Sequence, residues 1–247
     1  MCRELILSWQ DMKSREWFAV GRLSFIDNKY KFGYTSGALN AKKAGFLGLA
    51  GMNEFSKIYR SDKIFPVFQN RILNKSRPDR SEFLDWLNID LDNYSQLEEL
   101  ARTGGIKATD SLRLYPVPYA IDGKYVVNFF AHGVSHLIES YKKRANELLP
   151  GEKLYMCADL ENEYDKNALI LRTKDPIEVV GFCPKFFAED FYTVFEASKK
   201  CFSINLVRVN MDAPEQLRLL CKLSCEWPDN FLPLNKPEFQ LISTSKI

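Results

Sequence analysis

Hydrophobic and polar residues alternate along the first part of the chain in the way that is typical of β-strands. The ranges 4–9, 17–25 and 30–34 are rich in aromatic and branched side chains, which recur at roughly every second position. Asp27 and Asn28 separate the last two ranges, and both residue types tolerate the positive φ angles of a tight hairpin. The pattern therefore predicts three strands, with a hairpin between the second and the third.

Helical spacing follows a glycine-rich stretch. Residues 35–52 contain four glycines and are typical of a loop around a short helix. The ranges 81–87 and 95–103 repeat apolar residues on one helical face, and Gly104 and Gly105 supply a stop for the second helix. We therefore predict two helices after the loop.

Proline residues near position 118 predict a boundary between two domains. A strand-like range, 111–117, ends at the sequence Pro116-Val117-Pro118. A chain of 247 residues also suits two modest domains better than one large core. We expect residues 1–118 to form a small mixed α/β domain.

The second half of the chain is dominated by short strands. One helix interrupts them, because Pro184 suits its first turn and Phe187 and Phe191 recur at helical spacing. The predicted fold class is therefore α+β, with a mainly-β, barrel-like domain with one helix over residues 119–226. Residues 227–247, which contain three prolines, are expected to form an extended tail. The strands are expected at 125–131, 153–158, 168–173, 179–183, 202–210 and 216–225.

The charge of the chain limits how it can bind nucleic acid. The sequence holds 34 Lys and Arg against 32 Asp and Glu, so the protein as a whole is not a polycation. Basic residues gather between Lys57 and Arg80, where they form either a solvated surface or a landing surface for phosphates or an acidic partner. Any contact with nucleic acid must therefore come from a local patch.

Hydropathy and cysteine usage indicate a cytoplasmic protein without a membrane contact. No stretch approaches about 18 uncharged apolar residues, the length of a membrane span. Residues 1–9 lack the apolar core of a signal peptide. The six cysteines form no CxxC pair and lie mostly in apolar runs, so we expect them to be reduced.

Two polar clusters resemble metal sites, but their spacing argues against both. His132 and His136 are four residues apart, yet Gly133 between them breaks a helix and no H-E-x-x-H motif is present. The carboxylates at 159, 161, 163 and 165 alternate as in a calcium loop, but the sixth position is not glycine and the twelfth is not glutamate. We therefore predict no metal, no cofactor and no catalytic centre.

A more specific signal lies in the second half. Residues 162–171 have the sequence N-E-Y-D-K-N-A-L-I-L, and residues 180–185 have the sequence V-G-F-C-P-K. This resembles the HIRAN domain, in which N-x-Y-D-x-N-A precedes a strand and V-G-x-x-x-K opens a helix. The order, the spacing and the strand–helix context all agree, over residues 125–225.

The resemblance implies a DNA-binding module. HIRAN domains bind DNA, and one that is appended to eukaryotic fork-remodelling translocases grips a single-stranded 3′ end. By this resemblance Tyr164 would stack on a terminal base, while Asn162 and Asp165 would bond the sugar or base at the end. A segment starting at Gly133 would form another wall, with Lys185 near the backbone. The positions assigned to DNA contact are His136, Asn162, Tyr164, Asp165, Phe182 and Lys185.

These residue types suit the recognition of a DNA end. An aromatic ring contributes about 1–3 kcal/mol for each stacked base, whatever the sequence. A carboxylate that faces a free hydroxyl accepts a hydrogen bond, which favours ends over internal phosphates. Two positions depart from the family pattern: Ser135 stands where an arginine is usual, and Glu163 stands where a proline is usual. The first departure removes a phosphate donor and the second adds negative charge.

A second resemblance covers residues 15–118. The ranges 20–23, 30–34 and 65–73 look like the N-terminal subdomain of HipA-type kinases. That subdomain carries no phosphotransfer residues, and the chain has no H-R-D or D-F-G motif. Some toxin–antitoxin operons encode the subdomain as a separate protein that restrains a shortened kinase. The resemblance therefore implies a HipA-like kinase, or a helix-turn-helix protein, as a partner.

Two functions follow from the sequence. In the first, the protein is a non-catalytic binder of single-stranded DNA or DNA ends, joined to an N-terminal protein-interaction module. In the alternative, it is an antitoxin-like regulatory partner of a HipA-like serine/threonine kinase. The two are compatible in one chain.

Overall fold

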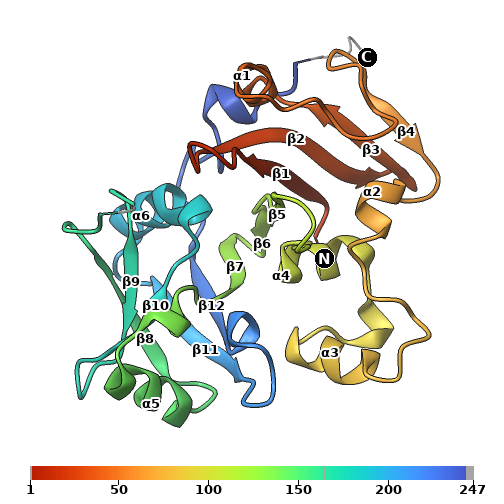
Figure 1. Ribbon diagram of the computed structural model, residues 1–247. Helices are drawn as coiled ribbons and strands as arrows, with labels where there is room; N and C mark the ends of the chain where they lie inside the picture. The colour runs from red at the N-terminus through yellow and green to blue at the C-terminus, as the bar shows by residue number, and fades with distance from the viewer. Residues whose placement is uncertain (1, 164, 243–247) are drawn as a thin grey trace. The chain divides into compact units, whose positions relative to one another are not determined.

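The computed structural model describes residues 2–163 and 165–242, which divide into two compact units (Figure 1). The first unit comprises Met1–Asp85, Ile89–Val117 and Leu234–Ile247, and the second comprises Trp86–Asn88 and Pro118–Pro233. Each unit has its own antiparallel sheet. The described residues form twelve strands and six α-helices, a mixed α and β architecture.

The first unit is built on a five-stranded sheet in the order β4-β3-β2-β1-β5 (Figure 1). The hairpin predicted between the second and third strands is confirmed, because Asp27 and Asn28 have φ angles of 53° and 57° and β2 pairs with β3. The strands are β1 (Glu4–Gln10), β2 (Trp17–Ile26), β3 (Lys29–Tyr34), β4 (Tyr59–Ser61) and β5 (Leu112–Pro116). Four helices follow β3 in the chain: α1 (Gly37–Lys43), α2 (Pro66–Gln69), α3 (Arg80–Trp86) and α4 (Gln96–Thr103).

The first unit contains a cluster of aromatic side chains and a buried ion pair. The ring of Phe32 lies 5.1 Å from that of Tyr34 and 5.6 Å from that of Phe68, centroid to centroid. Glu99 of α4 is fully buried and accepts hydrogen bonds from the Tyr94 hydroxyl at 2.8 Å and from the backbone N–H of Leu73 at 2.7 Å. Its carboxylate also lies 3.4 Å from the guanidinium of Arg80, itself only 9% exposed.

The basic run between Lys57 and Arg80 is not one continuous landing surface. Arg71 has a 2% exposed side chain, pairs with Asp110 and donates to the carbonyl of Gly105. Arg80 is buried against Glu99, as described above. Two arginines of this run, Arg71 and Arg80, are therefore buried in ion pairs that stabilise the first unit.

The C-terminal segment returns to the first unit, so the predicted tail at 227–247 is divided between the two units. Residue 241 forms a bridge with Thr35, just beyond β3. The backbone N–H of Ser36 donates to the carbonyl of Gln240 at 2.8 Å, and that of Ile242 donates to the carbonyl of Tyr34 at 2.9 Å. Residues 234–242 therefore complete the first unit.

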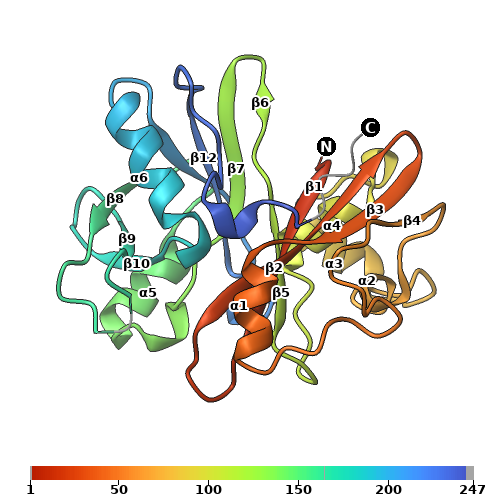
Figure 2. The same ribbon diagram turned by 90° about the horizontal axis from the view of Figure 1, so that it is seen from above.

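The second unit contains a seven-stranded sheet in the order β10-β9-β8-β11-β12-β7-β6, and Figure 2 shows β6, β7 and β12 side by side. The sheet is open, so the expectation of a closed, barrel-like domain holds only loosely. A single bridge between His132 and Phe182 joins the end of β7 to β10, and no continuous ladder forms there among the described residues. The strands are β6 (Ala120–Ile121), β7 (Lys124–Phe130), β8 (Lys153–Ala158), β9 (Leu169–Arg172), β10 (Val179–Phe182), β11 (Ser203–Val209) and β12 (Leu219–Glu226).

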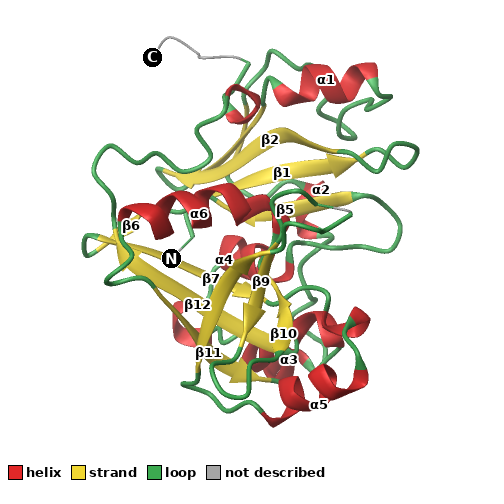
Figure 3. Ribbon diagram, turned by 90° about the vertical axis from the view of Figure 1, so that its left-hand side faces the viewer, coloured by secondary structure: helices red, strands yellow, loops and turns green. Residues whose placement is uncertain are grey.

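Two α-helices, and not the single one predicted, belong to the second unit. The predicted helix is α6 (Ala188–Ala197), which lies along the sheet in Figure 3 and packs Phe191 against Phe129 at 5.3 Å between ring centroids. The missed helix is α5 (Glu139–Glu147). Its sequence, ESYKKRANE, buries only Ala145, so hydrophobic periodicity could not reveal it.

The remaining findings concern the cysteines, groups of side chains that could bind a metal, and helices that could span a membrane. All six cysteines are free. Among the described residues, no group of His, Cys, Asp and Glu is arranged to hold a metal ion. No described helix is long and apolar enough to cross a membrane.

Candidate nucleic-acid interface

The loop between β8 and β9 is organised by its own polar side chains. The amide of Asn162 donates to the carboxylate of Asp159 at 2.9 Å, and its carbonyl oxygen accepts from the backbone N–H of Asp165 at 2.9 Å. The carboxylate of Asp165 accepts in turn from the N–H of Asn167 at 3.1 Å. The residues of the N-x-Y-D-x-N pattern therefore shape the loop as well as offering polar groups, as Asn and Asp commonly do in turns. Tyr164 lies outside the described residues.

Asp165 and Lys185 are brought together from distant parts of the chain. Lys185 begins the short 3₁₀ helix Lys185–Phe187 that follows β10, and its ammonium lies 3.5 Å from the Asp165 carboxylate. The carboxylate side chain is 18% exposed and the lysine side chain is 61% exposed. The lysine thus reduces the repulsion that a bare carboxylate would exert on a nearby phosphate, while its exposed end remains accessible.

Phe182 and the segment that begins at Gly133 form a second wall. The backbone N–H groups of His132 and Phe182 each donate to the other residue's carbonyl at 2.9 Å. A Cβ atom at Gly133 would lie 3.0 Å from the Phe182 ring, so the ring lies over this glycine. Phe182 is half-buried and leaves part of its ring accessible.

Gly181 is required for this wall, and sequence reasoning did not single out its role. Its φ angle is +153°, and a Cβ atom there would lie 2.9 Å from the Ala131 Cβ and 3.1 Å from the His132 carbonyl oxygen. The strand β10 can therefore approach the end of β7 only because residue 181 has no side chain. The glycine in V-G-F-C-P-K was the available signal.

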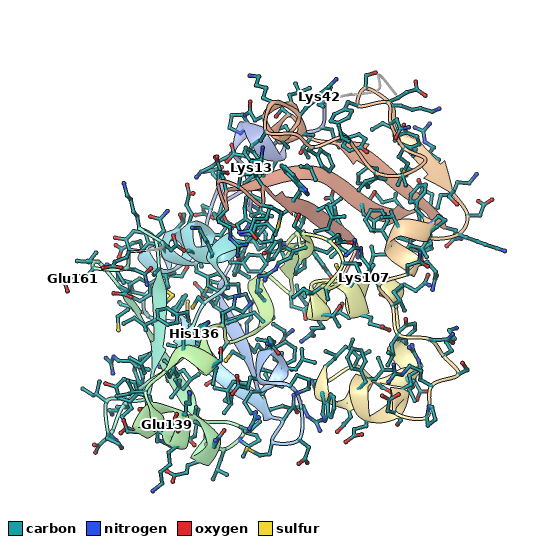
Figure 4. All side chains as sticks on the ribbon, in the orientation of Figure 1. Lys13, Lys42, Lys107, His136, Glu139 and Glu161 are labelled. Atoms are coloured by element: carbon teal, nitrogen blue, oxygen red, sulfur yellow. The ribbon has the colours of Figure 1, made fainter. Side chains whose placement is uncertain are left out.

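His136 occupies a different position from the acidic loop. It ends the 3₁₀ helix Val134–His136, and its backbone N–H donates to the carbonyl of Gly133 at 3.0 Å. Its side chain is exposed. Figure 4 shows His136 in the segment after β7 and Glu161 at the outer edge of the loop between β8 and β9. The structure thus brings Asp165 into contact with Lys185, and Phe182 into contact with Gly133. His136 belongs to the chain segment that follows Gly133.

The charge around the loop is negative on balance. The loop carries the carboxylates of Asp159, Glu161, Glu163 and Asp165, and Glu161 and Glu163 are exposed. The cations of the two sequence motifs, residues 162–171 and 180–185, are Lys166 and Lys185, and both are exposed. The attraction of a polyanion to this unit therefore requires basic side chains elsewhere on it.

Comparison with known proteins identifies the second unit. Residues 124–228 match the family described as "HIRAN domain". A solved structure described as a crystal structure of a protein from Lactobacillus plantarum, a structural genomics target, is similar with a TM-score of 0.32 and 14% identity. That match covers 42% of this chain and 100% of the other. No curated protein matches the chain.

The family match leaves the N-terminal half without support for its resemblance to HipA-type kinases, so the expected kinase or helix-turn-helix partner stays a prediction. In the other half, the matched range begins at the first residue of β7 and extends two residues beyond β12. It contains the loop between β8 and β9, Phe182 and Lys185. Residues 124–228 of the chain therefore form a HIRAN domain.

Proposed function

We propose that the protein is a non-catalytic binder of single-stranded DNA, which its HIRAN domain recognises at a free end. The observation that carries the proposal is the pairing of Asp165 with Lys185, three residues after the half-buried Phe182, within a domain of a DNA-binding family. The N-terminal unit supplies a protein-interaction module in this proposal.

The chemistry of the pair favours an end over an internal nucleotide. The Asp165 carboxylate has one oxygen bonded to Asn167 N–H and near Lys185, and a carboxylate has further lone pairs for a sugar hydroxyl. A terminal hydroxyl can donate to it, whereas an internal phosphate cannot. Lys185 is then placed to contact the phosphate next to that end. A ring at position 164 would stack on the terminal base.

The test uses the full-length protein and a short single-stranded oligonucleotide with either a free or a phosphorylated 3′ end. Tyr164→Ala should lower affinity by about 5- to 150-fold, which corresponds to about 1–3 kcal/mol of stacking. Asp165→Asn keeps an acceptor for Asn167 N–H and should reduce the preference for the free end, with little effect on binding to the blocked one.

A lysine pair provides a matched control for charge. Lys185→Gln should lower affinity for every oligonucleotide and reduce the salt dependence by about 0.7 per phosphate contact. Lys166→Gln removes an exposed lysine from the same loop and should have a smaller effect. Melting temperatures identify any variant that acts by unfolding the domain. If the wild-type protein binds neither oligonucleotide at low salt, the proposal is wrong.

A further inference from the structure

The two faces of the second sheet differ sharply in polarity. The inner face, against which α6 packs, is formed by buried residues such as Leu154, Leu171 and Ile204. The alternate positions on the same strands are partly or fully exposed and point to the opposite face. On β8, β9, β11, β12 and β7 this outer face includes Lys153, Tyr155, Cys157, Ile170, Arg172, Ser203, Asn205, Lys222, Ser224, Glu226, Lys124, Val126 and Asn128.

Two cations lie over one aromatic ring on this outer face. Tyr155 of β8 is directly opposite Arg172 of β9 in the ladder, and the guanidinium lies 5.2 Å from the ring centroid. The ammonium of Lys153 lies 5.4 Å from the same centroid. Tyr155 and Arg172 are half-buried and Lys153 is exposed. A base can stack on this ring when one of the cations moves from the ring to a flanking phosphate, so that the ring and the cations together suit a single strand.

The positive charge continues across the sheet in register. Lys153 is opposite Asn205, Asn205 is opposite Lys222, and Lys222 is opposite Asn128. The amides and lysines therefore alternate along one line that crosses four strands. The outer-face positions named above include four cations and one carboxylate, that of Glu226, which is opposite Lys124 in the ladder. This face thus supplies the attraction for a polyanion that the acidic loop lacks.

The outer face is continuous with the site for the DNA end. Phe182 pairs with Ile170, which pairs with Cys157, and the next outward row along the same strands is Arg172 with Tyr155. Rows two residues apart on a strand are separated by about 7 Å. A chain that is held at Phe182 therefore meets Tyr155 without crossing any other element of the sheet.

We propose that the outer face binds the internal nucleotides of the single strand whose end the HIRAN domain holds. Tyr155 is the stacking platform of this path, and Lys153, Arg172 and Lys222 contact its phosphates. A duplex is a poorer occupant, because paired bases do not offer their faces to an aromatic side chain. The inference rests on the proposed function and names residues outside the motif that suggested it.

The test compares the full-length protein on free-ended single strands of about four and about twelve nucleotides, the range of site sizes for such folds. The wild-type protein should bind the longer strand more tightly. Tyr155→Ala should weaken binding of the longer strand by about 5- to 150-fold and leave the shorter strand nearly unchanged. Tyr155→Phe should retain the wild-type behaviour, because it keeps the ring.

A charge variant tests the path through its phosphate contacts and leaves the Tyr155 ring in place. The combination K153Q, R172Q and K222Q should reduce the salt dependence for the longer strand by about 2, at about 0.7 per released counterion. A control with three exposed lysines of the first unit changed, K13Q, K29Q and K43Q, should leave it unchanged.

The outcomes separate this proposal from the previous one. Equal affinity for short and long strands would refute the path and leave end recognition intact. A loss of binding to both lengths in Tyr155→Ala, with an unchanged melting temperature, would place Tyr155 in the end site and also refute the path. If a duplex of the longer length binds equally well, the outer face is a general electrostatic surface and not a path for a single strand. No binding of any strand by the wild-type protein would refute both proposals.

Discussion

Replacing Gly181 by alanine tests how the second unit holds together the wall formed by Phe182 and the Gly133 segment. The residue is buried, its φ angle is +153°, and β10 approaches the end of β7 through it. An added Cβ would lie 2.9 Å from the Cβ of Ala131 and 3.1 Å from the carbonyl oxygen of His132. Neither atom is the end of a flexible side chain, so relief requires the backbone of β10 or of residues 131–132 to move.

The expected cost has two sources. Overpacking a well-filled site costs about 1–3 kcal/mol, and a side chain at a positive φ adds about 1–3 kcal/mol. Gly181→Ala should therefore lower the free energy of unfolding of the second unit by about 2–6 kcal/mol. This is a large part of the total for a domain, which is about 5–15 kcal/mol.

A matched control separates the two sources. Gly123 also has a positive φ, +73°, but a Cβ there meets no atom within 4 Å. Gly123→Ala should therefore cost only the backbone strain, about 1–2 kcal/mol. Both variants would be unfolded in urea and followed by circular dichroism. Equal losses of stability in the two variants would show that β10 does not need its close approach to β7, and the account of the wall would be refuted.

Three further predictions concern the first unit. Glu99→Gln should lower its unfolding free energy by about 3–5 kcal/mol in urea, because the Arg80 guanidinium is then buried without a counter-charge; a loss below 1 kcal/mol would show that the pair is dispensable. Burial raises the pKa of Tyr34 and of Tyr94 to about 12 from the ordinary value of 10, so their stabilisation is complete below pH 10 and is lost as the pH rises through 12. Tyrosinate absorbance that appeared near pH 10 without unfolding would contradict this. Deleting residues 234–247 should lower the melting temperature of the first unit, since Gln240 and Ile242 form backbone hydrogen bonds with Ser36 and Tyr34, and an unchanged value would show that residues 234–242 are only attached to the surface.

The HIRAN motif shows what a local sequence pattern can and cannot predict. The pattern at 162–171 correctly located the domain, but it did not predict that Asp165 and Lys185 form an ion pair. The sequence did not reveal that Asn162 also builds the loop, because that role depends on hydrogen bonds within a folded turn. The Tyr155–Arg172 pair was also hidden, since its two residues are seventeen positions apart and meet only through strand register.

The sequence by itself determined most of the strands, the hairpin at Asp27 and Asn28, and the helix that ends at Gly104. These elements depend on short-range hydrophobic periodicity and on the backbone preferences of single residues, which are present before any tertiary contact forms.

Only the tertiary structure decided which charges are buried, where the C-terminal segment lies and how the second sheet is joined. Arg80 looks like part of a basic surface until Glu99 is placed beside it. Residues 234–242 look like a tail until their backbone groups pair beyond β3. Helix α5 forms with only one buried residue, so nothing in its own hydrophobic pattern predicts it. For the buried charges and the C-terminal segment the deciding interaction joins residues that are far apart in the chain, and local periodicity carries no information about such partners.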